Sequence, residues 1–143
     1  MAKKIYIINA NYYEEISDRL VCGAINFLNE NDISHEIVNV PGALEIPTVI
    51  NLIHDKVNTK VDIGFIAVGC VIRGETSHYD YVCSESARAL MQMSLDGLSI
   101  GYGILTCESK EQAIVRSSAE GLNKGKAATL ACLRMIELKK EMY

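Results

Sequence analysis

The stretch from Ile63 to Ile72 reads Ile-Gly-Phe-Ile-Ala-Val-Gly-Cys-Val-Ile and contains no charged residue. A continuous apolar run rich in β-branched side chains is typical of a strand that is covered on both faces, as in a parallel sheet. The run is too short to cross a bilayer, which requires about 20 residues. We therefore expect a central, buried strand of an α/β protein.

Strands and helices alternate on both sides of this run. Short apolar segments predict further strands over Lys4–Asn9, His35–Val40 and Leu98–Cys107. Apolar residues at every third or fourth position predict helices over Glu14–Asn29, Glu45–Lys56, Ser77–Asp96, Ser109–Ala119 and from Asn123 to the end. Ser77 and Asp80 have the spacing of a capping box. Because such alternation produces right-handed parallel crossovers, we expect a three-layer α/β sandwich.

The composition excludes several classes of protein. A chain of 143 residues suggests one domain over 1–143, and its net charge of −4 argues against a general nucleic-acid binder. No signal sequence or membrane segment is evident, so we expect a soluble, cytoplasmic protein without a membrane partner. The five cysteines are far apart and form no C-x-x-C, which favours reduced, mostly buried thiols over disulfides or zinc.

Ligands of open parallel sheets bind beyond the carboxyl ends of the strands. The loop after Ile72 reads Arg-Gly-Glu-Thr-Ser-His over 73–78. Its glycine and hydroxyl residues lead directly into a helix, whose free N–H groups can bind an anion, although such a loop is also an ordinary helix cap. His78, in the first turn, is a candidate for proton transfer, and a surface histidine is the simpler alternative.

The loops after the first two strands carry Tyr12 and Glu45. A flat ring beside an acid, an anion site and a histidine suits a planar heterocycle with a polyhydroxy or phosphate group. Glu45 alone is equally an acid that complements a helix dipole. The sequence lacks the motifs of dinucleotide-binding folds, P-loops, zinc proteases and serine hydrolases. The residues by themselves therefore indicate an α/β enzyme acting on small molecules.

Several segments, in order and with matching gaps, resemble the lumazine synthase family: Val40–Pro47, Gly69–Cys83, Gly103–Thr106, Glu111–Ile114 and Asn123–Gly125. The resemblance implies a flavodoxin-like parallel sheet of four strands in the order 2-1-3-4, flanked by helices. It also implies a transferase that condenses 5-amino-6-(D-ribitylamino)uracil with L-3,4-dihydroxy-2-butanone 4-phosphate. The product would be 6,7-dimethyl-8-ribityllumazine, the penultimate intermediate of riboflavin biosynthesis, made without cofactor or metal.

The resemblance also implies roles for individual residues. His78 would be the catalytic proton-transfer group. The phosphate would be bound by Glu75, Thr76, Arg116 and Lys124. The remaining substrate contacts would be made by Tyr12, Ala43, Leu44, Glu45, Val71, Ile72 and Tyr102. Among these, Tyr12 would stack on the pyrimidine and Glu45 would bind the ribityl hydroxyls.

Family members have active sites between adjacent protomers, so Tyr102, Arg116 and Lys124 would come from a neighbouring chain. They assemble as pentamers or as 60-mers of twelve pentamers. Because the chain begins almost at its first strand, without the N-terminal extension of shell-forming members, we expect the free pentamer. Functional coupling to riboflavin synthase, which uses the product, is a further implication.

Some positions depart from the family pattern. Tyr12 replaces a Phe or Trp, Leu44 stands where Phe is common, and Val115 stands where an acid is frequent. Two alternatives remain open: an archaeal-type riboflavin synthase, which shares the fold, and a non-catalytic flavin-binding or shell protein. The intact His78-bearing loop argues against the first, and His78, Arg116 and Lys124 together argue against the second.

Overall fold

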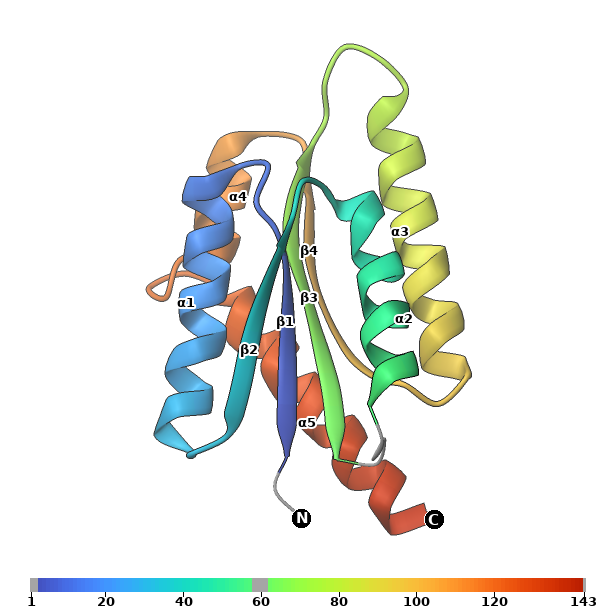
Figure 1. The fold of residues 1–143 in the computed structure, drawn as a ribbon. Coiled ribbons are helices and arrows are strands. Elements are labelled where there is room, and N and C mark those ends of the chain that lie inside the picture. The colour runs from blue at the N-terminus through green and yellow to red at the C-terminus, as the bar shows by residue number, and fades with distance from the viewer. Residues whose placement is uncertain (1–2, 58–61, 143) are drawn as a thin grey trace.

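The computed structural model describes residues 3–57 and 62–142. Within them, four parallel strands form one sheet in the order β2-β1-β3-β4, as Figure 1 shows. The strands are β1 (Lys4–Ala10), β2 (Ser34–Val40), β3 (Ile63–Ile72) and β4 (Ser99–Cys107). The expected strand order and the parallel pairing are confirmed.

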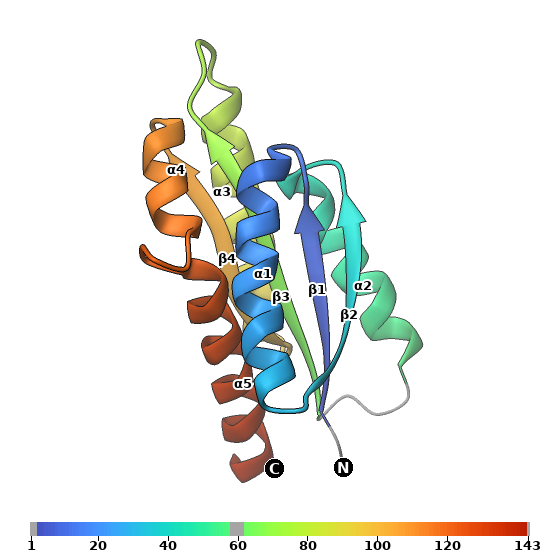
Figure 2. The same cartoon turned by 90° about the vertical axis from the view of Figure 1, so that its left-hand side faces the viewer.

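The helices form the two outer layers. One face of the sheet is covered by α1 (Glu14–Glu30), α4 (Lys110–Ser117) and α5 (Lys124–Met142). The other face is covered by α2 (Ile46–Lys56) and α3 (His78–Leu95), with the short 3-10 helix η1 (Ala43–Glu45) before α2. Figure 2 shows α1, α4 and α5 in front of the sheet. The three-layer α/β sandwich is therefore confirmed.

The central strand β3 is covered on both faces, as its sequence predicted. Its side chains alternate between the two cores. Ile66 and Val68 pack with α1 and α5, whereas Phe65 and Ala67 pack with α2 and α3. All four are at most 1% exposed. Burial on both sides explains why this strand has no polar face.

The capping box predicted at Ser77 is wrong. Ser77 occupies the N-cap position of α3, but its side chain makes no capping hydrogen bond. The Asp80 carboxylate, which was expected to reach back, instead faces Arg73, with 3.3 Å between Arg73 Nη1 and Asp80 Oδ1. A guanidinium is a stronger partner for a carboxylate than a single backbone N–H, so the ion pair replaces the capping box.

Glycine allows α5 to approach α1 closely. A Cβ atom on Gly125, in the first turn of α5, would overlap the backbone carbonyl of Leu20 in α1. This contact involves backbone on both sides, so rotation of a side chain offers no relief. The backbones of α1 and α5 can approach this closely because Gly125 carries no side chain.

Gly125→Ala is therefore expected to destabilise the protein by about 1–3 kcal/mol, the usual cost of overpacking. The matched control is Gly74→Ala, because a Cβ there has nothing within 4 Å. Thermal unfolding measures the effect: the first variant should melt several degrees lower, and the second should melt at or above the wild-type temperature. Equal melting temperatures for the two variants would contradict the packing argument.

The cysteines are mostly buried, as expected. Cys70, Cys107 and Cys132 are buried, Cys83 is partly buried, Cys22 is exposed, and all are free. Burial raises the pKa of the Cys132 thiol to about 12. Burial, together with the neighbouring Cys107 thiol, raises the pKa of Cys70 to about 12 as well.

These thiols should differ in reactivity, because the thiolate is the nucleophilic form. At pH 8, a thiol with a pKa near 12 is ionised in only about one molecule in 10⁴. Iodoacetamide should therefore label exposed Cys22 in the native protein and leave Cys70 and Cys132 unlabelled until the chain is unfolded. Peptide mass spectrometry checks this, and alkylation of native Cys70 as fast as that of Cys22 would contradict it.

Among the helices of the described segments, none combines the length and the apolar character that crossing a membrane requires.

Candidate active site

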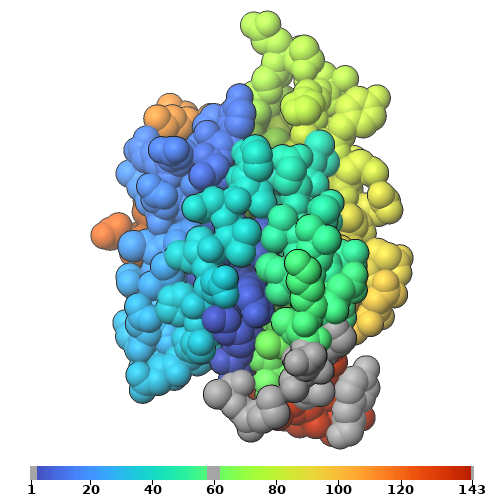
Figure 3. All heavy atoms as spheres, viewed as in Figure 1, coloured from blue at the N-terminus to red at the C-terminus, as the bar shows by residue number. Residues whose placement is uncertain are grey.

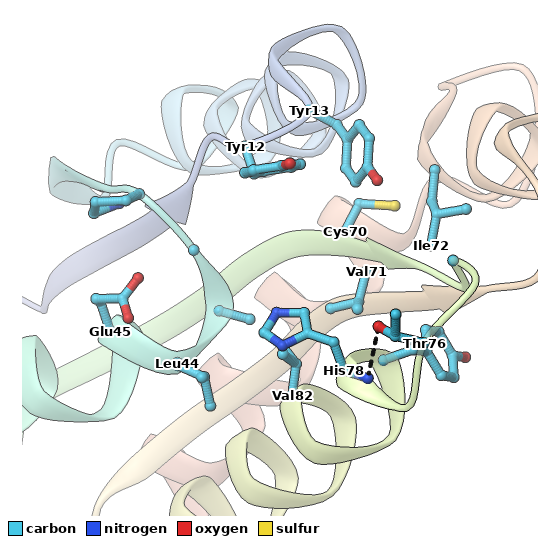
Figure 4. Close-up of a pocket in the computed structure, with 15 residues that line it drawn as sticks. Tyr12, Tyr13, Leu44, Glu45, Cys70, Val71, Ile72, Thr76, His78 and Val82 are labelled. Atoms are coloured by element: carbon cyan, nitrogen blue, oxygen red, sulfur yellow. Dashed lines mark hydrogen bonds between the residues drawn. The ribbon is translucent and has the colours of Figure 1, made fainter.

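A cavity of about 410 Å³ lies beyond the carboxyl ends of β1, β2 and β3. Its size is in the range of pockets that bind small molecules. It is lined by Tyr12, Tyr13, Pro41, Gly42, Ala43, Leu44, Glu45, Cys70, Val71, Ile72, Gly74, Thr76, His78, Tyr79 and Val82. Figure 4 shows these residues, and in Figure 3 the loop between β3 and α3 rises above the same end of the molecule. The cavity is thus where a parallel sheet is expected to bind its ligand.

The turn between β1 and α1 supplies two aromatic rings. Tyr12 is 74% exposed, and its ring meets that of Tyr13 edge to face, with 4.9 Å between the centroids. Desolvation, with smaller contributions from Tyr12 and Cys70, raises the pKa of Tyr13, so its hydroxyl stays protonated. Because most of the Tyr12 side chain is exposed, its ring can stack on a planar molecule.

The segment after β2 places an acid at the mouth of the cavity. Ala43, Leu44 and Glu45 form η1, which is closed by a hydrogen bond from the Glu45 N–H to the Gly42 carbonyl at 3.2 Å. A Cβ on Gly42 would lie 3.2 Å from Glu45 Oε1, so the glycine leaves room for the carboxylate. Glu45 precedes α2 instead of beginning it, which differs from the predicted helix start.

The loop after β3 carries the histidine. Residues 74–78 are exposed, and the His78 N–H donates to Thr76 Oγ1 at 3.4 Å. In Figure 4 the imidazole of His78 points away from this loop and into the cavity, across from Tyr12. The start of α3 therefore offers an imidazole and a helix N-terminus to the same ligand.

Most of the predicted site residues come together in this cavity. Those that line it are Tyr12, Ala43, Leu44, Glu45, Val71, Ile72, Thr76 and His78. Glu75 belongs to the same loop but does not line the cavity. The three residues expected from later in the chain, Tyr102, Arg116 and Lys124, do not line it either.

Those three residues lie elsewhere in the fold. Tyr102 is in the middle of β4, and its hydroxyl interacts with Ser86 of α3. Arg116 is in the last turn of α4, where its Nη1 donates to the Gln112 carbonyl at 3.1 Å. Lys124 is the first residue of α5. The residues that line the cavity of one chain consequently include neither lysine nor arginine.

Some lining residues were not predicted. Tyr13, Pro41, Gly42 and Gly74 belong to the loops that the sequence pointed to, so adjacency to the predicted residues was the available signal. Cys70, Tyr79 and Val82 carried no such signal, because their place depends on how β3 and α3 face the cavity. Across residues 3–57 and 62–142, no group of three His, Cys, Asp or Glu side chains could hold a metal ion.

The sequence of the chain matches a known protein family. The model of the 6,7-dimethyl-8-ribityllumazine synthase family matches residues 2–140. The chain belongs to this family.

Individual members of the lumazine synthase family are similar over almost their whole length. A 6,7-dimethyl-8-ribityllumazine synthase from Zymomonas mobilis is 45% identical over 139 residues, covering 97% of this chain and 98% of its own. Another from Bartonella bacilliformis is 46% identical over 137 residues, with 95% and 90% covered. The cavity and the loops around it therefore lie within the part of the chain that the lumazine synthase family shares.

Proposed function

We propose that the protein condenses 5-amino-6-(D-ribitylamino)uracil with L-3,4-dihydroxy-2-butanone 4-phosphate to 6,7-dimethyl-8-ribityllumazine, releasing phosphate and water. The observation that carries the proposal is the cavity that unites Tyr12, Glu45 and His78 in a member of this family. The relatives reported above are named as lumazine synthases, which favours this activity over that of an archaeal-type riboflavin synthase.

The pyrimidine substrate would bind on the side of the cavity formed by β1, η1 and β3. The exposed face of Tyr12 stacks on the heterocycle, and Glu45 accepts hydrogen bonds from the ribityl hydroxyls. Backbone groups of Val71 and Ile72, at the end of β3, meet the uracil edge. Ala43 and Leu44 complete this side.

The phosphorylated substrate would bind at the start of α3. Backbone N–H groups near Glu75 and Thr76 and the positive end of the helix dipole attract the phosphate. A phosphate dianion also requires cations, and the lining of a single chain has no lysine or arginine. We therefore assign this role to Arg116 and Lys124 of a neighbouring subunit, with Tyr102 of the same subunit closing the site.

The reaction needs little covalent help from the protein. The 5-amino group of the uracil adds to the ketone and water leaves to form an imine. Elimination of phosphate, ring closure and a further dehydration complete the heterocycle. Holding both reactants in reacting geometry can lower the barrier by about 7–11 kcal/mol. His78, whose ring points into the cavity, moves the protons, which contributes about 10²–10⁴-fold at most.

A shared site requires an oligomer, and we propose the free pentamer. Light scattering should give about five times the chain mass of 15.8 kDa. A mass sixty times that of the chain would show a shell instead of a free pentamer and would remain consistent with a site shared between subunits. A fully active particle of 15.8 kDa would contradict the shared site.

Mixing the purified protein with both substrates tests the activity. The expected result is a new lumazine absorbance that rises in step with released phosphate, and its absence would reject the proposal. Consumption of added lumazine would instead identify a riboflavin synthase, and flavin binding without turnover would identify a non-catalytic relative. The proposal includes a cytoplasmic location, for which free thiols are suited, and delivery of the product to riboflavin synthase.

A further inference from the structure

The loop that carries the anion-binding groups has few contacts of its own. Residues 74–78 are all exposed, and a Cβ on Gly74 would have nothing within 4 Å. The hydrogen bond from the His78 N–H to Thr76 Oγ1 is long, at 3.4 Å. Figure 1 shows the loop projecting beyond the ends of the other strands. Its position therefore depends on what holds its two ends.

Arg73 joins both ends of this loop to β4. Its Nε donates to the Glu108 carboxylate, at 2.8 Å from Oε2 and 3.1 Å from Oε1. Its Nη1 donates to Asp80 Oδ1 at 3.3 Å, in the first turn of α3. The Arg73 backbone N–H also donates to the Cys107 carbonyl at 2.9 Å.

The same guanidinium lies over an aromatic ring. Arg73 Cζ is 4.3 Å from the centroid of Tyr79, a residue that lines the cavity. Hydrogen bonding to Glu108 raises the pKa of Arg73, so the side chain stays charged. The Arg73 side chain thus contacts both Glu108, which follows β4, and Asp80, in the first turn of α3, while Arg73 is itself the residue before the loop.

We propose that Arg73 is a positioning residue that holds the loop carrying Thr76 and His78 in the arrangement that binds the phosphorylated substrate. This inference rests on the proposed function. Arg73 is the cation nearest the anion site in sequence, but it does not line the cavity and its donors face two carboxylates. It therefore acts through the loop and makes no direct contact with the phosphate.

The ion pairs of Arg73 with Glu108 and Asp80 should affect the order of the loop more than the free energy of unfolding of the whole protein. The Arg73 side chain is 44% exposed, and exposed ion pairs contribute little to the free energy of unfolding. The order of the loop should depend more strongly on Arg73. The exposed loop has few other contacts, and it can open locally while the sheet stays folded. Loss of Arg73 should consequently leave the melting temperature nearly unchanged while the loop becomes mobile.

Steady-state kinetics of Arg73→Met test the proposal. We expect KM for the phosphorylated substrate to rise between about 10-fold and 10²-fold, because small misplacement of binding groups is costly. KM for the ribitylaminouracil should stay within about twofold, since its contacts come mainly from other segments. Arg73→Lys should lie between wild type and Arg73→Met, because an ammonium keeps an ion pair but loses the planar, forked geometry.

Glu108→Gln provides a second, nearly isosteric test, which remains informative if Arg73→Met folds poorly. It should raise KM for the phosphorylated substrate in the same direction. KM of the double variant, Arg73→Met with Glu108→Gln, should be no higher than that of Arg73→Met alone, because both changes break the same ion pair. The matched control is Arg88→Met, which removes an exposed ion pair to Glu85 at 2.9 Å, with both partners within α3 and outside the loop. It should leave both KM values unchanged.

Hydrogen exchange of the Asp80 and Tyr81 amides, which donate to the Ser77 carbonyl at the end of the loop, separates this inference from the proposed function. In the full-length protein, these amides should exchange at least about tenfold faster in Arg73→Met than in wild type or Arg88→Met. If wild type makes no lumazine, the proposed function fails, while the exchange experiment still tests the role of Arg73. Unchanged exchange, or an equal rise in both KM values, would overturn the inference.

Discussion

Replacing Arg116 with alanine is expected to lower kcat/KM for the phosphorylated substrate by about 10²-fold. A charge-assisted hydrogen bond contributes roughly 1.5–3 kcal/mol, and a guanidinium can form two of them with one phosphate. Arg116 is half-buried in the last turn of α4, where its described side-chain hydrogen bond goes to a backbone carbonyl rather than to an acid. Its charge is thus available to a substrate.

Initial rates at varied concentrations of each substrate measure this effect. KM for the ribitylaminouracil should change little, because the assigned partner of Arg116 is the phosphate. Arg134→Ala is the control, since it removes an arginine of α5 whose Nη1 is 3.0 Å from Glu137 on the same helix. Unchanged kinetics with the phosphorylated substrate in Arg116→Ala would refute the phosphate role.

Replacing His78 with alanine is expected to lower kcat by about 10²-fold, the lower end of the range for general acid–base catalysis. Proton transfer is lost, but both substrates are still held together, and this proximity provides most of the acceleration. The control is His35→Ala in β2, whose Nδ1 is 3.2 Å from the Ile33 carbonyl, at the end of the sheet away from the cavity. Complete loss of turnover in a folded His78→Ala protein would contradict this prediction and show that the reaction depends on the imidazole.

Mixed assemblies of these two variants test whether the site is shared. If His78 and Arg116 of one site come from different subunits, co-assembly of the two variants restores sites that contain both native residues. Random mixing in equal amounts restores about a quarter of the sites, since each side of a head-to-tail interface is native in half of the subunits. Activity above that of the separate variants is the expected result, and simple averaging would contradict the shared site.

Local patterns in the sequence were sufficient to predict the layers of the fold. The run from Ile63 to Ile72 has the bounds of β3 because both of its faces are buried, so no polar residue interrupts it. The interactions at the helix starts were predicted less well, because tertiary contacts compete there with local ones. Asp80 was expected to cap α3, but it pairs with Arg73, and Glu45 lies in a 3-10 turn that spacing did not indicate.

The site could be predicted in part for a similar reason. Parallel strands end at the same edge of a sheet, so Tyr12, Glu45 and His78, which follow three different strands, had to lie near one another. The link between Arg73 and Glu108 joins residues 35 positions apart, and nothing in the local sequence indicates it. The roles of Tyr102, Arg116 and Lys124 came from resemblance alone, because one chain does not bring them to the cavity.

The absence of lysine and arginine from the cavity lining of one chain has a kinetic consequence within the proposed mechanism. A newly made subunit is inactive until it assembles with others. Specific activity should therefore rise with protein concentration and then level off, as mass action requires of an obligate assembly. Dilution would switch the catalyst off without unfolding it, and a cell that holds few copies would produce disproportionately little product.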